Sequence, residues 1–262
     1  MDYILICFVS FFVAGLTFFS GFGLGTLLLP AFAFFFPIET AIAATAAVHL
    51  ANNIFKAFLI GKSADKQLVV LFALPAAIAA FIGASLLNYV SQVSFSFTYS
   101  IGKSYFTITT VKLMISILMI FFAFFEIVPH LRSKQINRKY IPLGGILSGF
   151  FGGLSGHQGA LRTAFLLRSG LDKKEFIGTI VLSAIIIDVS RLIVYGNTFL
   201  SSKLNIFFSD NMRGLILAGT LCAFVGSAIG KYLLDKVTFK SIQFTVAAML
   251  IILGLAIGAG LI

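Results

Sequence analysis

Several polar side chains lie inside strongly apolar stretches, and these are the residues whose types and spacing can do chemistry. They are His49, Asn52, Asn53 and Lys56 in one stretch, and Asp188 and Arg191 in another. Spacings of three and four place side chains on one face of a helix. Polar groups are costly in an apolar environment, so they mark sites for ions or protons. Because an imidazole can titrate near neutral pH, His49 and its acidic counterpart Asp188 are candidates for proton coupling.

The two cations of this group allow two interpretations. Lys56 and Arg191 are candidate charge partners for an anion, yet both lie close enough to the end of an apolar run to extend toward the membrane surface. Asp188 and Arg191 are also expected to pair with each other, because they are three residues apart on a helix.

Two glycine-rich turns form the second group of candidates. The first is Ser20-Gly-Phe-Gly-Leu-Gly-Thr26, and the second is Gly152-Gly-Leu-Ser-Gly-His-Gln-Gly159, followed by Arg162. Each turn is expected to lead into a short helix, whose free N–H groups and partial positive charge favour an anion. The predicted substrate-binding residues are Gly21, Gly23, Gly25, Thr26, Asn52, Asn53, Ser155, Gly156, His157, Gln158, Gly159 and Arg162. The alternative is that the glycines only allow helices to pack closely.

The composition places these residues in a membrane. The chain has 262 residues, of which 59% are hydrophobic and 11% charged, whereas about 25% are charged in soluble domains. We therefore predict a single all-α membrane domain over residues 1–262, surrounded by the lipid bilayer. The net charge of +10 fits basic loops at the membrane surface, and no basic stripe interleaved with aromatics predicts nucleic acid. Two cysteines predict no metal site, and no cofactor is predicted.

Six apolar runs are long enough to cross the membrane. They are Ile38–Ile60, Leu68–Val90, Thr109–Val128, Phe176–Tyr195, Leu215–Lys231 and Ile242–Ile262. The connection 129–140 is basic and has no acid, so it is predicted to be cytoplasmic. The loop Ser91–Ile108 and both termini then lie outside. Because the chain has no Trp, tyrosines such as Tyr195 are expected to anchor the interfaces.

The two remaining apolar regions, Tyr3–Pro37 and Ile141–Leu171, are interrupted by glycines. The loop orientations require each of them to return to the side from which it started. Each half of the chain is therefore predicted to be a broken-helix hairpin followed by three spans, with repeat one at about 1–128 and repeat two at about 141–262. This makes eight membrane segments, or ten if each hairpin arm spans. Inverted repeats with broken helices are typical of secondary transporters.

The two glycine-rich segments resemble those of the TauE/SafE family of sulfite and organosulfur anion exporters. The resemblance rests on Ser20-Gly-Phe-Gly-Leu-Gly-Thr-Leu-Leu-Leu-Pro30, on Gly61-Lys-Ser-Ala-Asp65, and on Ser148-Gly-Phe-Phe-Gly-Gly-Leu-Ser-Gly-His-Gln-Gly-Ala-Leu-Arg162. It implies a secondary transporter in the cytoplasmic membrane that exports a sulfite, sulfonate or related sulfur oxyanion held between the two hairpins. Proton coupling and a homodimer are compatible with it.

Two other functions compete with transport. A glycine-lined, positively charged constriction also suits a passive anion channel. The segment Gly153-Leu-Ser155-Gly156 resembles the G-x-S-G of rhomboid intramembrane proteases. A nucleophilic serine needs a base within hydrogen-bond reach. No histidine follows His157, which itself is expected on the wrong side of the helix, so we predict that the protein is not an enzyme.

Overall fold

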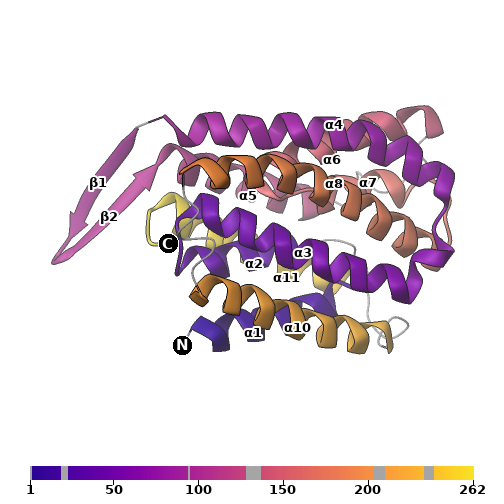
Figure 1. Cartoon of the computed structure of the whole chain (residues 1–262), viewed down its shortest axis with the longest axis horizontal. Coiled ribbons are helices and arrows are strands. Elements are labelled where there is room, and N and C mark those ends of the chain that lie inside the picture. The colour runs from indigo at the N-terminus through magenta and orange to yellow at the C-terminus, as the bar shows by residue number, and fades with distance from the viewer. Residues whose placement is uncertain (1, 19–22, 94, 128–136, 203–209, 233–238) are drawn as a thin grey trace.

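The described chain is a bundle of α-helices that run roughly along one axis, with one β-hairpin at its end (Figure 1). The structure is a computed structural model that describes all residues except 1, 19–22, 94, 128–136, 203–209 and 233–238. The first half contains α1 (Asp2–Leu16), α2 (Leu24–Ala33), α3 (Ile38–Ile60), η1 (Gly61–Ser63), α4 (Lys66–Ser91), β1 (Ser96–Ile101), β2 (Ser104–Thr109) and α5 (Thr110–Ile127). The second contains η3 (Arg138–Tyr140), α6 (Ile141–Ser155), α7 (Gly159–Leu166), α8 (Lys173–Ser202), α10 (Asp210–Tyr232) and α11 (Phe239–Gly258).

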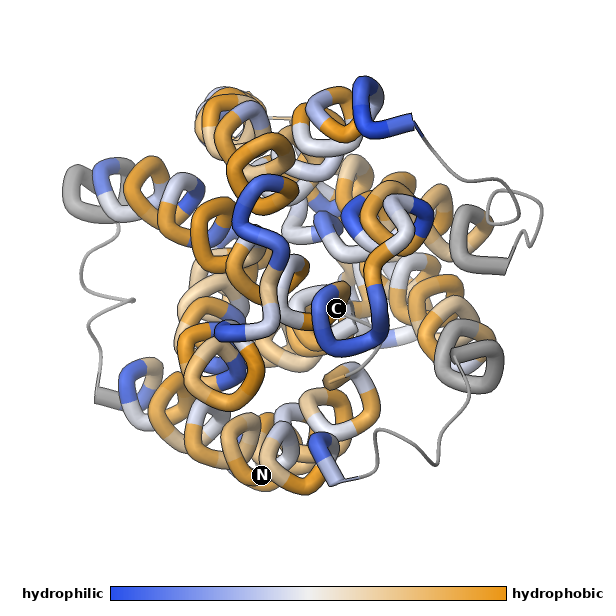
Figure 2. Tube along the Cα trace, turned by 90° about the vertical axis from the view of Figure 1, so that its right-hand side faces the viewer, coloured by the Kyte–Doolittle hydropathy of each residue, from blue (hydrophilic) through white to orange (hydrophobic). Residues whose placement is uncertain are grey.

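The helices have the length and apolar surface of a multi-pass membrane protein. Within the described residues, four segments can cross a bilayer by length and composition: Ile38–Ser63, Lys66–Ser91, Lys173–Asn197 and Asn211–Tyr232. Four shorter apolar helices accompany them. An end-on view shows hydrophobic residues along the helices and hydrophilic ones gathered at the near end (Figure 2). The expected all-α membrane bundle is confirmed.

Both glycine-interrupted regions are broken into two short helices. The arms α1 and α2 have 15 and 10 residues, or about 22 and 15 Å of helix, whereas the hydrocarbon core is about 30 Å thick. The arms α6 and α7 have 15 and 8 residues. A single arm is therefore too short to span, and the buried turn between α6 and α7 lies inside the bundle. Both chain ends lie at the end of the bundle that carries the β-hairpin (Figure 1).

The most extensive helix contacts join the two halves of the chain. Helix α4 packs along α6 and α1 packs along α10. The other large contacts between the halves are α5 with α11, α4 with α8 and α3 with α8. The first arm of each hairpin is therefore held mainly by a helix of the other half.

Closely spaced glycines explain the contact between α6 and α4. The glycines of α6 face successive carbonyl groups of α4, pairing Gly145 with Phe72, Gly149 with Ala76 and Gly153 with Ala80. A Cβ atom at any of the three would overlap the partner backbone. Helix α10 approaches α1 in the same way, since Gly226 faces the carbonyl of Phe11. For these glycines the packing interpretation is correct, because small residues let membrane helices approach closely.

Substituting one of these glycines should loosen the bundle. Gly149→Ala places a methyl group against the backbone of Ala76, and the resulting overpacking should cost about 1–3 kcal/mol. Gly196→Ala is the matched control, because nothing lies within 4 Å of its Cβ position and alanine is the better helix former. In detergent, the melting temperature should fall for Gly149→Ala and stay level or rise for Gly196→Ala. Equal melting temperatures would contradict this account of the interface.

The β-hairpin between α4 and α5 is the main element that the sequence interpretation missed, since the segment was expected to be a loop. Its strands pair antiparallel, with Phe97 opposite Ile108 and Tyr99 opposite Phe106. These four residues share one face, because side chains alternate along a strand. The Tyr99 hydroxyl donates a hydrogen bond to the Ala259 carbonyl. The apolar face of the hairpin is thereby attached to the end of α11.

Candidate functional site

A buried carboxylate, Asp188 on α8, lies at the centre of the polar cluster. Its Oδ2 atom is 2.6 Å from Nδ1 of His49 on α3. Its Oδ1 atom accepts hydrogen bonds from Nε2 of Gln158 at 2.8 Å and from Nη2 of Arg191 at 2.7 Å. All four side chains are buried. One carboxylate thus joins two long helices to the turn between α6 and α7.

The local pairings expected from helix spacing are present. Nδ2 of Asn53 lies 3.1 Å from Nδ1 of His49, one turn away on α3, and 3.4 Å from Oδ2 of Asp188. The expected pair of Asp188 and Arg191 is also formed, and Nε of Arg191 adds a second bond at 3.0 Å. Buried charges of this kind persist because each has partners.

Helix α8 also holds the second hairpin turn in place. Gly156 ends α6 with φ 81°, a left-handed conformation that favours glycine. Nη1 of Arg191 donates to the Gly152 carbonyl at 3.3 Å, and the Tyr195 hydroxyl donates to the Gly153 carbonyl. The expectation that Tyr195 anchors the membrane interface is therefore wrong. Its ring is buried because the broken end of α6 offers a carbonyl that needs a donor.

The first hairpin turn meets the second one beside His49. Gly23 precedes α2 with φ 115°, and Gly25 follows within the helix. A Cβ atom on Gly25 would lie 3.5 Å from the His49 ring and 3.6 Å from the Gly156 carbonyl oxygen. Thr26 instead donates its hydroxyl to the Gly23 carbonyl of its own turn. Gly21 lies outside the described residues.

Two further cations border a small cavity next to this cluster. The lining residues are Thr17, Phe18, Leu24, His49, Asn53, Lys56, Arg162, Ile180 and Val181. The cavity volume is about 10 Å³, near the minimum that holds one water molecule. Nζ of Lys56 lies 5.3 Å from the centroid of the Phe18 ring. Lys56, Arg162 and Arg191 are all buried, so Lys56 and Arg191 do not extend to the membrane surface.

The charge balance of the site favours an anion. Lys56, Arg162 and Arg191 supply three formal positive charges, and Asp188 supplies one negative charge. Among the described side chains of the site, this leaves a formal charge of +2 (3 − 1) even with His49 neutral. Because opposite charges attract strongly where water is excluded, an anion that enters the cavity is the natural counterpart of this excess.

Some predicted site residues lie away from the cavity. Asn52 accepts a hydrogen bond from the Ser227 hydroxyl on α10 at 2.8 Å. The His157 ring stacks on Phe122 of α5, with 5.7 Å between the ring centroids. Gly159 begins α7 and is buried. Asn52 and His157 therefore pack between helices in the described conformation.

Ser155 and His157 do lie within hydrogen-bond distance of each other, with 3.0 Å between Oγ and Nδ1. The expectation that His157 lies on the wrong side is therefore incorrect. However, the Ser155 hydroxyl donates to the Phe151 carbonyl at 3.0 Å. A nucleophilic serine must give its proton to the base, and this hydroxyl proton points elsewhere.

Four polar residues in the described part of the site were not predicted as site residues from the sequence. Thr17 lines the cavity, Tyr195 holds the α6 end, Ser227 binds Asn52, and the Ser148 hydroxyl donates to the Gln158 carbonyl at 2.8 Å. Only Tyr195 carried a usable signal, because it follows Arg191 by four residues and shares its helical face.

Comparison with known families gives one match. The sequence model described as sulfite exporter TauE/SafE matches residues 3–257 of the 262. Searches of curated proteins and of solved structures gave no match. Since the match covers both hairpins and the helices that carry the polar cluster, the chain belongs to the sulfite exporter TauE/SafE family of membrane transporters.

Proposed function

We propose that the protein is a secondary transporter that exports a small anion, a sulfite, sulfonate or related sulfur oxyanion, across the cytoplasmic membrane. The observation that carries the proposal is the excess of buried cations around one cavity where two broken-helix turns meet. Lys56 and Arg162 are the proposed partners of the anion, since charge-assisted hydrogen bonds are the strong ones. A potential that is negative inside drives anions outward, with about 2.3 kcal/mol per charge per 100 mV.

We further propose that the two halves are inverted repeats in a single membrane domain. If α1 to α5 correspond in order to α6, α7, α8, α10 and α11, the contact of α4 with α6 becomes that of α10 with α1. Under the same exchange of helices, the contact of α3 with α8 is mapped onto itself, and so is the contact of α5 with α11. This exchange supports the duplication. In the proposed orientation the connection 129–140 is cytoplasmic and both termini lie outside.

Flux in proteoliposomes tests this function. Sulfite, methanesulfonate, sulfate and chloride would be compared with and without an imposed pH gradient, and protein-free liposomes are the control. Saturable flux of sulfite or the sulfonate, accelerated by the same unlabelled anion on the opposite side, is the expected result. Unsaturable flux without such exchange would instead identify a channel. Flux of none of these anions would refute the proposal.

His49 is the proposed proton-binding group of the transport cycle. It is surrounded by Asp188, Asn53 and, across the cavity, by Lys56 and Arg162. A proton on His49 adds a positive charge beside the anion, so flux should change as the pH is lowered. His49→Gln keeps a polar side chain without this charge, and its flux should vary less with pH than that of the parent protein. A pH profile parallel to the parent's would exclude His49 from this role.

A further inference from the structure

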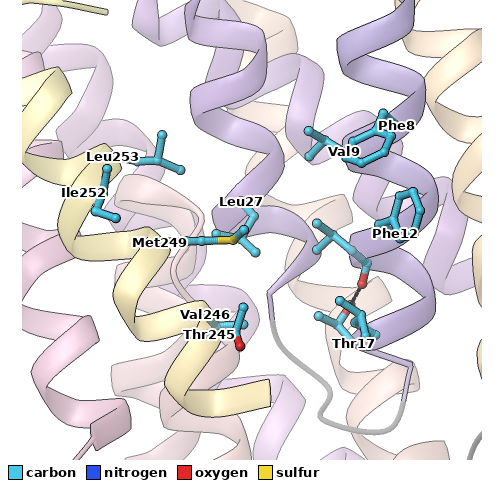
Figure 3. A pocket seen from close by; sticks show the side chains of 12 residues that line it. Phe8, Val9, Phe12, Thr17, Leu27, Thr245, Val246, Met249, Ile252 and Leu253 are labelled. Carbon is cyan, nitrogen blue, oxygen red and sulfur yellow. Dashed lines mark hydrogen bonds between the residues drawn. The ribbon is translucent and has the colours of Figure 1, made fainter. Parts of the chain in front are cut away.

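An apolar groove runs beside the polar cavity, between α1, α2 and α11 (Figure 3). Its volume is about 440 Å³, within the range of small-molecule sites. Except for Thr17 and Thr245, every lining side chain is apolar. Phe12 on α1 and Ile252 on α11 are 47% and 66% exposed, so the groove opens toward the flank of the bundle, where the lipid lies.

Thr17 is shared by the groove and the cavity, since its side chain lines both. Its hydroxyl donates to the Val13 carbonyl. Gly23 lies against its methyl group, and a Cβ atom on Gly23 would also come within 3.7 Å of Val246 on the groove wall. The wall between the groove and the cavity therefore contains the side chain of Thr17, and beside it lies Gly23, which has no side chain.

We propose that the groove binds an anionic amphiphile, with the hydrocarbon tail in the groove and a sulfonate head group at its Thr17 end, next to the cavity that Lys56 and Arg162 line. The head group would be held by Lys56 and Arg162, and this part rests on the proposed function. The tail has only apolar walls to contact, so each added CH₂ should tighten binding from water by about fourfold. The substrate class is then alkyl sulfonates and similar anions with a chain.

The region of the second half that corresponds to the groove is lined differently. In the proposed correspondence, α6, α7 and α5 match α1, α2 and α11. There the space beside the turn holds aromatic rings, because Phe122 on α5 contacts both Phe151 and His157 of the second hairpin.

The absence of Trp allows a direct binding test. Met249→Trp places the chain's single Trp on the groove wall, and Ile78→Trp places it on an exposed flank of α4 as the matched control. Both variants would be titrated in nanodiscs with 8-bromooctanesulfonate, whose bromine quenches Trp fluorescence on contact. We expect saturable quenching for Met249→Trp and only linear, partition-type quenching for Ile78→Trp.

Competition separates the tail from the head group. Octanesulfonate should displace the brominated probe at a concentration at least about tenfold lower than octanol, because a charged group then has charged partners. Butanesulfonate should need about 250-fold more than octanesulfonate, because its chain lacks four CH₂ groups. Adding Arg162→Gln to the reporter variant should reduce the advantage of octanesulfonate over octanol.

Equal displacement by octanesulfonate and octanol would show that the groove holds lipid tails only. Equal quenching in the Met249→Trp and Ile78→Trp variants would show that the probe only partitions into the bilayer. Either result overturns the inference. Failure of the proposed transport can be distinguished from failure of this inference. Absence of anion flux in proteoliposomes, with charge-dependent binding intact, would refute transport but leave the amphiphile site. Sulfite flux without charge-dependent binding at the groove would support transport and refute the amphiphile site.

Discussion

Asp188→Asn is expected to abolish anion flux and to lower the free energy of unfolding by about 3–5 kcal/mol, the usual cost of removing one partner of a buried ion pair. The carboxylate accepts hydrogen bonds from Gln158 and Arg191 and contacts His49. An amide of the same size removes the negative charge that balances Arg191, and its NH₂ group faces other donors. Thermal unfolding in detergent and sulfite flux in proteoliposomes would measure the two effects.

Two further variants make this result specific. Asp172→Asn is the matched control, because Asp172 is at an exposed helix start where its Oδ1 accepts from the Glu175 backbone, and asparagine caps equally well. Its unfolding and flux should equal the parent's. The double variant Asp188→Asn, Arg191→Met removes both charges and should regain part of the stability but no flux. Parent-like stability and flux in Asp188→Asn would disprove the central role of this carboxylate.

Arg162→Gln is expected to raise the half-saturating concentration of the anion by about 10- to 100-fold, because a hydrogen bond to a charged partner contributes about 1.5–3 kcal/mol. The guanidinium lines the cavity and is buried, so little solvent screens its charge. Glutamine keeps hydrogen-bond donors but loses the charge. Initial rates of sulfite flux over a range of concentrations would give the shift.

Arg138→Gln is the control for general effects of charge. Arg138 is exposed and pairs with Asp65, with 3.8 Å between Nη2 and Oδ2. Such surface pairs contribute about 0–1 kcal/mol, so the half-saturating concentration should remain at the parent value. If Arg162→Gln and Arg138→Gln behaved alike, Arg162 would not contact the anion.

The sequence allowed prediction of those features that depend on neighbouring residues. The bounds of α3 agree with the predicted span Ile38–Ile60. Helical periodicity placed His49 and Asn53 on one face and paired Asp188 with Arg191, as found. Periodicity is sufficient here because both partners belong to one helix, whose geometry is fixed by its own backbone.

Contacts between distant segments could not be predicted in this way. His49 and Asp188 are 139 residues apart, and both were proposed for the same role without any sign that they touch. Tyr195 was placed at the interface because tyrosine is common there, whereas the carbonyl that it binds exists only once α6 breaks. The apolar groove depends on how α1, α2 and α11 pack, which no single segment determines.

The glycine interfaces limit how the bundle can rearrange during a transport cycle. At Gly145, Gly149 and Gly153, where α6 meets α4, and at Gly226, where α10 meets α1, backbone lies directly against backbone. Each of these pairs takes one helix from either half of the chain. If one half rocked against the other as a rigid body, both interfaces would have to open at once. The moving units are therefore expected to be α4 with α6 and α1 with α10, with the sliding surfaces elsewhere in the bundle.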